Sequence, residues 1–297
     1  MSKGILNGVV AYALWGFFPL YWKLLREVPA PQLLGHRIIW SFALLIAIIG
    51  VSGQWRDFHS VVNWRVFRVY LIASILIGVN WLVYVWAVNS DFVIEASLGY
   101  FINPLLSVLL GVLFLRERLR AAQWLSVGLA VIGVGYLTFV YGRLPWIALV
   151  LAFSFGFYGL VKKLAPLGSL YGLTFETGIL LVPALVYLGV AEAARTGAFL
   201  HSGATADWLM VGAGAVTTIP LLLFASAAKQ IPLTIVGVLQ YLTPTLQFLL
   251  GVFVYHELFD RSQLFGFGLI WLALGVFGIE GYAVSRAKQG APARFVR

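Results

Sequence analysis

The stretch YFINPLLSVLLGVLFLRERL, residues 100–119, joins a long apolar run to a charged end. A bilayer core of about 30 Å needs roughly 20 apolar residues in a helix, and charges in the positions of Arg116 to Arg118 favour the membrane surface. Asn103 and Pro104 interrupt the apolar run near its start. The stretch therefore predicts a membrane-spanning helix that carries a polar, kinked position inside and a charged anchor at its end.

The composition extends this prediction to the whole chain. Of the 297 residues, 61% are hydrophobic and 10% are charged, and the mean hydropathy is +0.94. Soluble domains carry about 25% charged residues, so a soluble protein with a large core is excluded. Long apolar runs without alternation indicate helices, not barrel strands. We expect an all-α membrane protein with ten transmembrane helices, at residues 4–24, 31–50, 68–88, 92–115, 122–141, 145–163, 170–192, 207–229, 233–255 and 262–283.

The charges predict the topology. If the N-terminus is cytoplasmic, 14 of the 20 Lys and Arg residues lie on the cytoplasmic side, which places both termini inside. This bias explains the net charge of +9 without a nucleic-acid partner. The first residues lead directly into the first span, so we expect no removable signal peptide. The absence of cysteine excludes disulfides and thiolate metal sites.

The opening stretch has a counterpart later in the chain, QYLTPTLQFLLGVFVYHE at residues 240–257. A gapless shift of 140 residues superposes Pro104 on Pro244, and it gives 11 identities in 43 pairs over residues 94–136. Each half then holds five spans, and an odd number inverts the second half in the membrane. Inverted repeats are typical of secondary transporters. We predict a first repeat at 1–142, a second at 143–285 and a basic cytoplasmic tail at 286–297.

Four ionisable residues within or near the ends of spans are candidates for handling protons or charge: His36, Arg37, Glu95 and Glu176. Such groups cost about 2.5–3.5 kcal/mol or more at the centre of a membrane helix. The 140-residue shift superposes His36 on Glu176, and an imidazole with a carboxylate could shuttle a proton. Two structural alternatives stay open: Arg37 and Glu95 pair at the outer interface, or Glu176 bonds to a helix end or to a lysine.

Proline and aromatic residues complete the predicted site. Pro104 and Pro244 each follow a small polar residue, and we interpret them as a hinge in each half, with a plain packing kink as the alternative. Polar and aromatic side chains within the spans are candidates to line a cavity for a flat organic molecule, although any one aromatic could serve helix packing alone. The predicted substrate-binding residues are Asn80, Trp81, Tyr84, Tyr100, Asn103, Tyr158, Gln240 and Tyr241.

The sequence carries no recognisable catalytic motif. It contains no H-E-x-x-H, no G-x-S-x-G and no G-x-x-x-x-G-K-[ST], and its four histidines are scattered without metal-ligand spacing. We therefore expect no enzyme activity, no metal and no cofactor. The expected partners are a small-molecule substrate and the lipid bilayer, and the oligomeric state stays open.

Six strings of this chain together resemble the RarD branch of the EamA family, within the drug/metabolite transporter superfamily. They are ILNGVVAYALWGFFPLYWKL at 5–24, HRIIWSF at 36–42, NWLVYVWAVN at 80–89, EASLGYFINPL at 95–105, FSFGFYGLVKK at 153–163 and QYLTPTLQFLLGV at 240–252. The resemblance implies a ten-helix carrier of the bacterial inner membrane with two EamA repeats, which exports a metabolite or drug-like solute. A lipid flippase on the same scaffold and, less favoured, an intramembrane enzyme remain alternatives.

Overall fold

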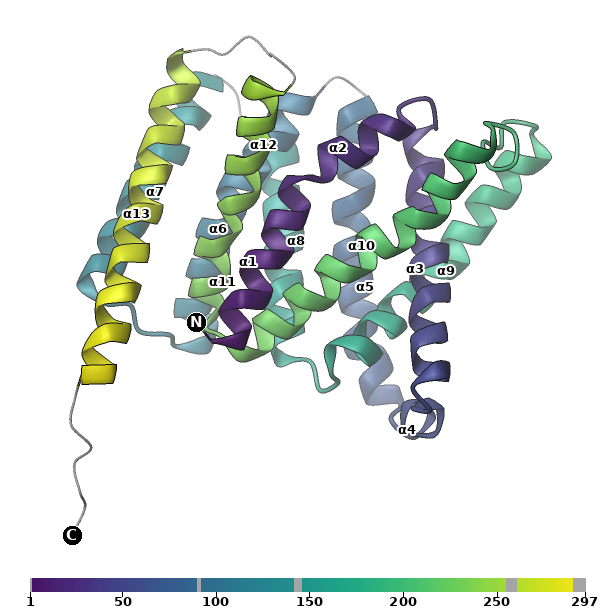
Figure 1. The fold of residues 1–297 in the computed structure, drawn as a ribbon, viewed down its shortest axis with the longest axis horizontal. Helices are drawn as coiled ribbons and strands as arrows, with labels where there is room; N and C mark the ends of the chain where they lie inside the picture. Colours follow the sequence, from purple (N-terminus) through teal and green to yellow (C-terminus); the bar gives the residue numbers. More distant parts are fainter. Residues whose placement is uncertain (1, 90–91, 142–145, 255–260, 291–297) are drawn as a thin grey trace.

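The computed structural model describes residues 2–89, 92–141, 146–254 and 261–290. These residues form helices and no strand, which confirms the all-α fold class. Within them, nine segments are long and apolar enough to cross a bilayer, and Gly99–Leu115 is a shorter apolar helix. Figure 1 shows the helices running between an upper and a lower face. The start of α1 (Lys3–Gly16) and the end of α13 (Arg261–Gly290) both lie at the lower face.

The first predicted span is broken. After α1 the chain continues past Phe17 as a short helix, α2 (Phe18–Trp22), and a 3-10 turn, η1 (Lys23–Leu25). Pro19 lies in the first turn of α2, where a missing N–H is tolerated, and it favours a new helix start over continuation of α1. The remaining helices of this half are α3 (Ala30–Val51), α4 (Trp55–Ser60), α5 (Trp64–Asn89), α6 (Val93–Leu115) and α7 (Ala121–Tyr141).

The second half also contains one broken span, the ninth, which divides at Tyr241. The last helix runs to Gly290, so the start of the predicted basic tail is helical, and the residues after 290 lie outside the described part. The helices of this half that precede α13 are α8 (Trp146–Leu164), α9 (Ser169–Ala193), α10 (Ala204–Gln230), α11 (Leu233–Gln240) and α12 (Leu242–Phe253).

Helix positions and contacts follow the 140-residue shift. The shift carries the bounds of α5 onto residues 204–229, within one residue of α10 at each end. It also carries one interhelical contact onto another. A Cβ atom added to Gly16 would lie 2.7 Å from Leu246, and one added to Gly156 would lie 2.8 Å from Leu106. Each glycine thus faces a leucine of the other half, and the 140-residue shift relates the two glycines and the two leucines.

The core at the centre of the molecule is aromatic. Rings from α1, α8 and α10 pack with centroid separations between 5.3 and 6.2 Å. The small residues of α1 face neighbouring helices and permit this close approach. The cluster therefore joins the two halves of the chain. Its members are Tyr12, Trp15, Phe155, Tyr158 and Phe224.

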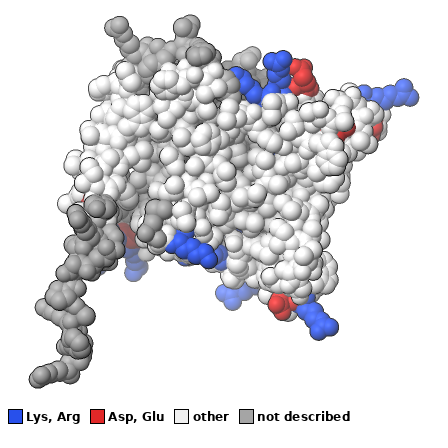
Figure 2. Space-filling view, viewed as in Figure 1, with Lys and Arg blue, Asp and Glu red and all other residues white. Residues whose placement is uncertain are grey.

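The surface is apolar between its two faces. Figure 2 shows Lys, Arg, Asp and Glu along the upper and lower rims, with an uncharged belt between them. On α5, Ile72, Ile75 and Leu82 are more than half exposed. A soluble protein would bury such a stripe, whereas lipid accepts it. The belt therefore identifies a multi-pass membrane protein.

Candidate functional site

A buried ion pair lies between α8 and α9, in the lower half of the molecule. Lys162 Nζ lies 2.7 Å from Glu176 Oε1, and the Tyr158 hydroxyl donates to Glu176 Oε2 at 2.8 Å. The lysine nitrogen is also 5.7 Å from the ring centroids of Tyr70 and Tyr158. All four residues are at most 1% exposed. We refer to Tyr70, Tyr158, Lys162 and Glu176 as the Glu176 cluster.

The two charges of the Glu176 cluster neutralise each other within the protein. Burying one charge is very costly, but a close pair with further hydrogen bonds offsets much of the desolvation. Both carboxylate oxygens of Glu176 have a donor, and the lysine adds two aromatic faces. Of the two structural alternatives for Glu176, the structure therefore shows the bond to a lysine. Lys162 and Tyr70 were not among the predicted site residues.

A second cluster surrounds Arg37, about 10 Å below the start of α3 at 1.5 Å per residue. Its guanidinium carbon lies 4.9 Å from the Trp22 ring centroid and 5.1 Å from that of Trp81. Its Nε donates to Thr217 Oγ1 at 3.0 Å. We refer to this group as the Arg37 cluster, and it brings together α2, α3, α5 and α10.

Two predicted tyrosines complete the Arg37 cluster. Tyr84 of α5 and Tyr100 of α6 meet edge to face, with ring centroids 5.9 Å apart. Tyr84 lies one helical turn after Trp81, whose ring contacts Arg37, so the two tyrosines lie beside the cluster. Four of the predicted residues, Arg37, Trp81, Tyr84 and Tyr100, are thus neighbours in the folded chain.

The predicted proton pair is not assembled in this structure. His36 is 7% exposed, and its ring packs on Phe199 with centroids 4.9 Å apart. Among the described residues, no hydrogen bond or ion pair joins it to Glu176. Figure 1 shows α3 starting at the upper face and α9 at the lower face, so the two residues approach from opposite ends. The side chain of Glu95 lies outside the described residues, so its pairing with Arg37 stays a prediction.

Asn80 and Tyr241 form hydrogen bonds to neighbouring helices. The Asn80 amide donates to the Leu151 carbonyl at 2.9 Å and to Ser154 Oγ at 3.0 Å, which joins α5 to α8. Tyr241 donates to the carbonyl of Phe101 at 3.2 Å.

Two buried side chains in this region carry amide groups. Gln240 is 4% exposed and precedes the break at Tyr241. Asn103 is also 4% exposed, and within the described part of the chain its Oδ1 has no hydrogen-bond partner. The Asn103 oxygen is therefore available for a partner from outside the described residues.

The two predicted hinge prolines have different local structures. Pro104 lies inside α6, which continues through it, whereas Pro244 lies in the first turn of α12, just after the break at Tyr241. Proline at 244 cannot donate to the carbonyl of Gln240, which favours the break there. A bend in both halves was expected, and only the second proline is accompanied by a divided helix.

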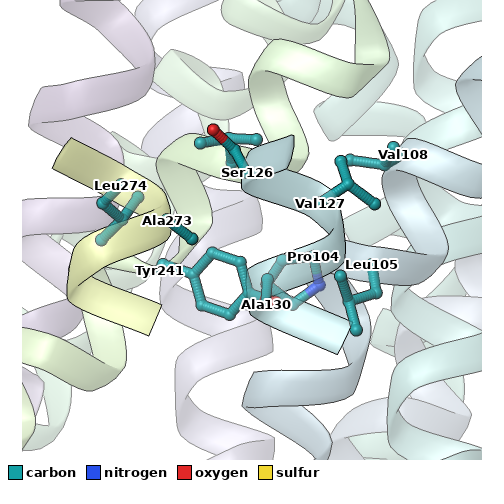
Figure 3. A pocket seen from close by; sticks show the side chains of 10 residues that line it. Pro104, Leu105, Val108, Ser126, Val127, Ala130, Tyr241, Ala273 and Leu274 are labelled. Carbon is teal, nitrogen blue, oxygen red and sulfur yellow. The ribbon is translucent and has the colours of Figure 1, made fainter. Parts of the chain in front are cut away.

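A small apolar cleft lies between α6, α7, α11 and α13. Figure 3 shows the Tyr241 ring and Pro104 in it, opposite side chains from α7 and α13. Its lining includes one side-chain hydroxyl besides that of Tyr241, on Ser126. Of the predicted residues, only Pro104 and Tyr241 line this cleft, so it is separate from both charged clusters.

Side chains also cap helix ends at the lower face. Glu117 accepts hydrogen bonds from the backbone N–H groups of Leu233 and Thr234, at 2.6 and 2.9 Å, and so caps the start of α11. Lys163 donates to two carbonyls at the end of α10, and Lys229 donates to two carbonyls that follow α8. These three residues form the lower-face caps. Glu117 joins the two halves, whereas the two lysines join α8 and α10 within the second half, all on the side where the predicted charge bias places the cytoplasm.

Charged groups held inside a lipid-facing helical bundle mark solute or ion pathways. The fold and the two clusters therefore define a multi-pass membrane protein of the transporter class. Residues 2–139 match the EamA-like transporter family. The chain is 46% identical to the uncharacterized transporter YojE of Bacillus subtilis, over 97% of both chains. It is 44% identical to the protein RarD of Salmonella typhimurium, over 96% of this chain and 98% of that one.

This chain belongs to the EamA-like transporter family, as a RarD-type member. A solved crystal structure has the same fold, with a TM-score of 0.69 over 93% of this chain and 97% of that chain, at 21% identity. The predicted family resemblance is therefore confirmed.

Proposed function

We propose that this chain is a secondary carrier that exports a small organic metabolite or drug-like solute across the bacterial inner membrane by alternating access. The observation that carries the proposal is the pair of reciprocal contacts, Gly16 on Leu246 and Gly156 on Leu106. Two inverted repeats related by a twofold axis in the membrane plane would make such contacts. Repeats of this kind exchange conformations around a site near the midplane.

A second reciprocal pair supports the same arrangement. A Cβ atom on Gly8 would lie 3.0 Å from Leu239, and one on Gly99 would lie 3.4 Å from the Ala148 Cα atom. The 140-residue shift converts the first pair into the second. We propose the repeat boundaries 1–142 and 143–285 on this basis.

The lower-face caps support a state that is closed toward the cytoplasm. Glu117 connects the end of α6 to α11, and Lys163 and Lys229 connect α8 to α10, through backbone groups that are otherwise left free at helix ends. Separating the halves at that face would break the bonds of Glu117. We propose that solute enters from the cytoplasm when they separate, and that Pro104 and Pro244 are the bend points.

The remaining candidate residues have roles within this cycle. We propose that the Glu176 cluster and His36 handle the coupling proton, and that the Arg37 cluster with Asn80, Asn103, Gln240 and Tyr241 forms the wall of the solute path. Transport then needs no cofactor and no covalent step. The relatives reported above are named as transporters where their names state a function.

A flippase on the same scaffold has weaker support. A groove opens between α3, α4, α5 and α9, as a flippase would need, but its lining is apolar apart from Thr174. Lipid chains suit such a lining, whereas a headgroup needs polar partners. The lining residues are Phe42, Ile46, Phe58, Phe67, Thr174, Phe175, Gly178, Ile179 and Val182.

Efflux from reconstituted vesicles tests the proposal. Proteoliposomes are loaded with a mixture of small aromatic and aliphatic solutes, and mass spectrometry follows their release with and without an imposed pH gradient. At least one solute should leave faster than from protein-free vesicles. Equal release of every solute overturns the carrier assignment.

Variants in the same vesicles test the proposed coupling and hinge. His36→Ala and Glu176→Gln should remove the response to the gradient, while Glu27→Gln, at an exposed rim position, should keep it. If both site variants retain the response, the proton roles are wrong.

Pro244→Ala should slow efflux by restoring a continuous helix, and an unchanged rate excludes the hinge.

A further inference from the structure

We propose that the Arg37 cluster binds the negative group of an aromatic organic anion, which makes singly charged aromatic carboxylates the substrate class. This inference rests on the proposed carrier function and adds the chemistry of its solute. It starts from the position of Arg37, a permanently charged group that lies about seven residues inside a membrane helix and is only partly exposed.

The neighbours of Arg37 hold its charge without neutralising it. Two indole faces lie 4.9 and 5.1 Å from the guanidinium carbon, and a threonine hydroxyl accepts from Nε. Aromatic faces and hydroxyls attract a cation but carry no net charge. Among the described residues, no carboxylate forms an ion pair with Arg37. The planar fork of the side chain is the geometry that binds a carboxylate through two hydrogen bonds.

The matched positions of the other half show the contrast. The 140-residue shift superposes Trp22 on Lys162 and His36 on Glu176, while Arg37 falls on Thr177 beside Glu176. In the Glu176 cluster the protein supplies both charges, 2.7 Å apart. In the Arg37 cluster the described part of the chain supplies the cation alone. An anion from solution would complete the upper cluster as Glu176 completes the lower one.

The rings around Arg37 specify the rest of the ligand. Trp22, Trp81, Tyr84 and Tyr100 are all partly exposed, and they come from three helices, so a flat ring can stack on them while its carboxylate meets the guanidinium. One guanidinium balances one negative charge, which favours monocarboxylates over dianions.

Three probes of one shape and different charge test the assignment. Phenylacetate is an anion, phenylacetamide is neutral and phenethylamine is a cation. Their binding to the purified full chain is measured by the shift in its thermal unfolding midpoint, because a ligand of the folded state raises apparent stability. Phenylacetate should raise the midpoint, and the other two should not. Equal effects of all three, including no effect from any, overturn the proposal.

Variants locate the site. Arg37→Gln should weaken phenylacetate binding about tenfold or more, since a charged hydrogen-bond partner is lost. Arg37→Lys should weaken it less, because it keeps the charge and loses the planar fork. Arg56→Gln, at an exposed position of α4, is the matched control and should bind normally. If Arg37→Gln still binds phenylacetate, the assigned site is wrong. If that variant does not fold, the comparison of the three probes on the unchanged chain still tests the preference for an anion.

Two further outcomes separate this inference from its rivals. If anion binding arises only in Glu95→Gln, then Glu95 is the natural partner of Arg37 and the proposal is wrong. If proteoliposomes export phenylacetamide as fast as phenylacetate, the carrier function stands and the anion assignment fails. If phenylacetate binds and is not exported, the site stands and the carrier function fails.

Discussion

At the scale of single residues, the Glu176 cluster gives the sharpest energetic prediction. Removing one member of a buried ion pair leaves an unpaired buried charge and costs about 3–5 kcal/mol, whereas replacing both by apolar groups is often neutral. Lys162→Met and Glu176→Leu should each lower the free energy of unfolding by about that amount, and the double variant should recover most of it. Equilibrium unfolding in mixed micelles measures this cycle, and additive losses would show that the pair has no coupling.

The two reciprocal glycines give a second prediction at this scale. Gly16→Ala and Gly156→Ala should each destabilise the protein by about 1–3 kcal/mol, because the added methyl group overpacks against a leucine less than 3 Å away. Gly128→Ala and Gly268→Ala are the matched controls, since nothing lies within 4 Å of either added methyl group. Equal midpoints for all four variants in thermal unfolding would contradict the packing described above.

Sequence reasoning identified Glu176 and missed its partner. Lys162 and Lys163 are adjacent and fit a cytoplasmic charge bias, so neither was considered a site residue. Consecutive residues of a helix point about 100° apart, which lets Lys162 face the core while Lys163 caps α10. Which of the two turns inward depends on how α8 packs, and this information is not local to the sequence.

At the scale of helices, the cap on α11 is a testable contact between the halves. Glu117→Ala should lower stability by about 0.5–2 kcal/mol, the usual effect of losing a helix cap. It should also speed hydrogen exchange at the amides of Leu233 and Thr234, which lose their acceptor. Glu27→Ala, in an exposed pair at the upper rim, is the control. Unchanged exchange at the start of α11 would remove Glu117 from the lower-face caps.

The sequence predicted the positions of the membrane spans well and the breaks within the spans poorly. In the described part of the chain, each of the ten predicted spans is mostly helical, because apolar length alone defines a membrane helix. The breaks at Phe17 and Tyr241 and the short helix α4 were missed. Pro104 and Pro244 remove the same kind of backbone bond, yet their neighbours differ: a glycine of α11 closes on the Pro104 carbonyl, within 2.7 Å of an added Cβ. The sequence does not show this contact, so it could not predict which proline accompanies a divided helix.

At the scale of the whole molecule, the absence of cysteine permits a direct test of topology. Ser60→Cys follows α3 in the first half, and Ser202→Cys follows α9 in the second, both at exposed positions. Inverted repeats should expose Ser60→Cys to the cytoplasm and Ser202→Cys to the opposite side. A membrane-impermeant maleimide, applied to intact cells and to inverted vesicles, measures this. Labelling of both from one side would contradict the inverted arrangement and leave the family assignment intact.

The architecture was more predictable than the site because the repeat is a property of spacing, whereas a site depends on neighbours. The 140-residue shift was readable in the sequence, and helix bounds and glycine contacts follow it. The grouping of Arg37 with Trp22 and Thr217 was not readable in the sequence, because those residues lie 15 and 180 positions away from Arg37. Only the folded chain brings them together.

The break at Tyr241 has no equivalent in α6, and this inequality bears on the energetics of transport. A carrier with two identical halves would populate its inward-facing and outward-facing conformations equally when empty. Here the ninth span is divided at Tyr241 while the matched helix α6 is unbroken, so exchanging the shapes of the two halves yields a different structure. If the two halves exchange conformations as proposed, the empty carrier should favour one orientation, set by the protein and independent of any gradient.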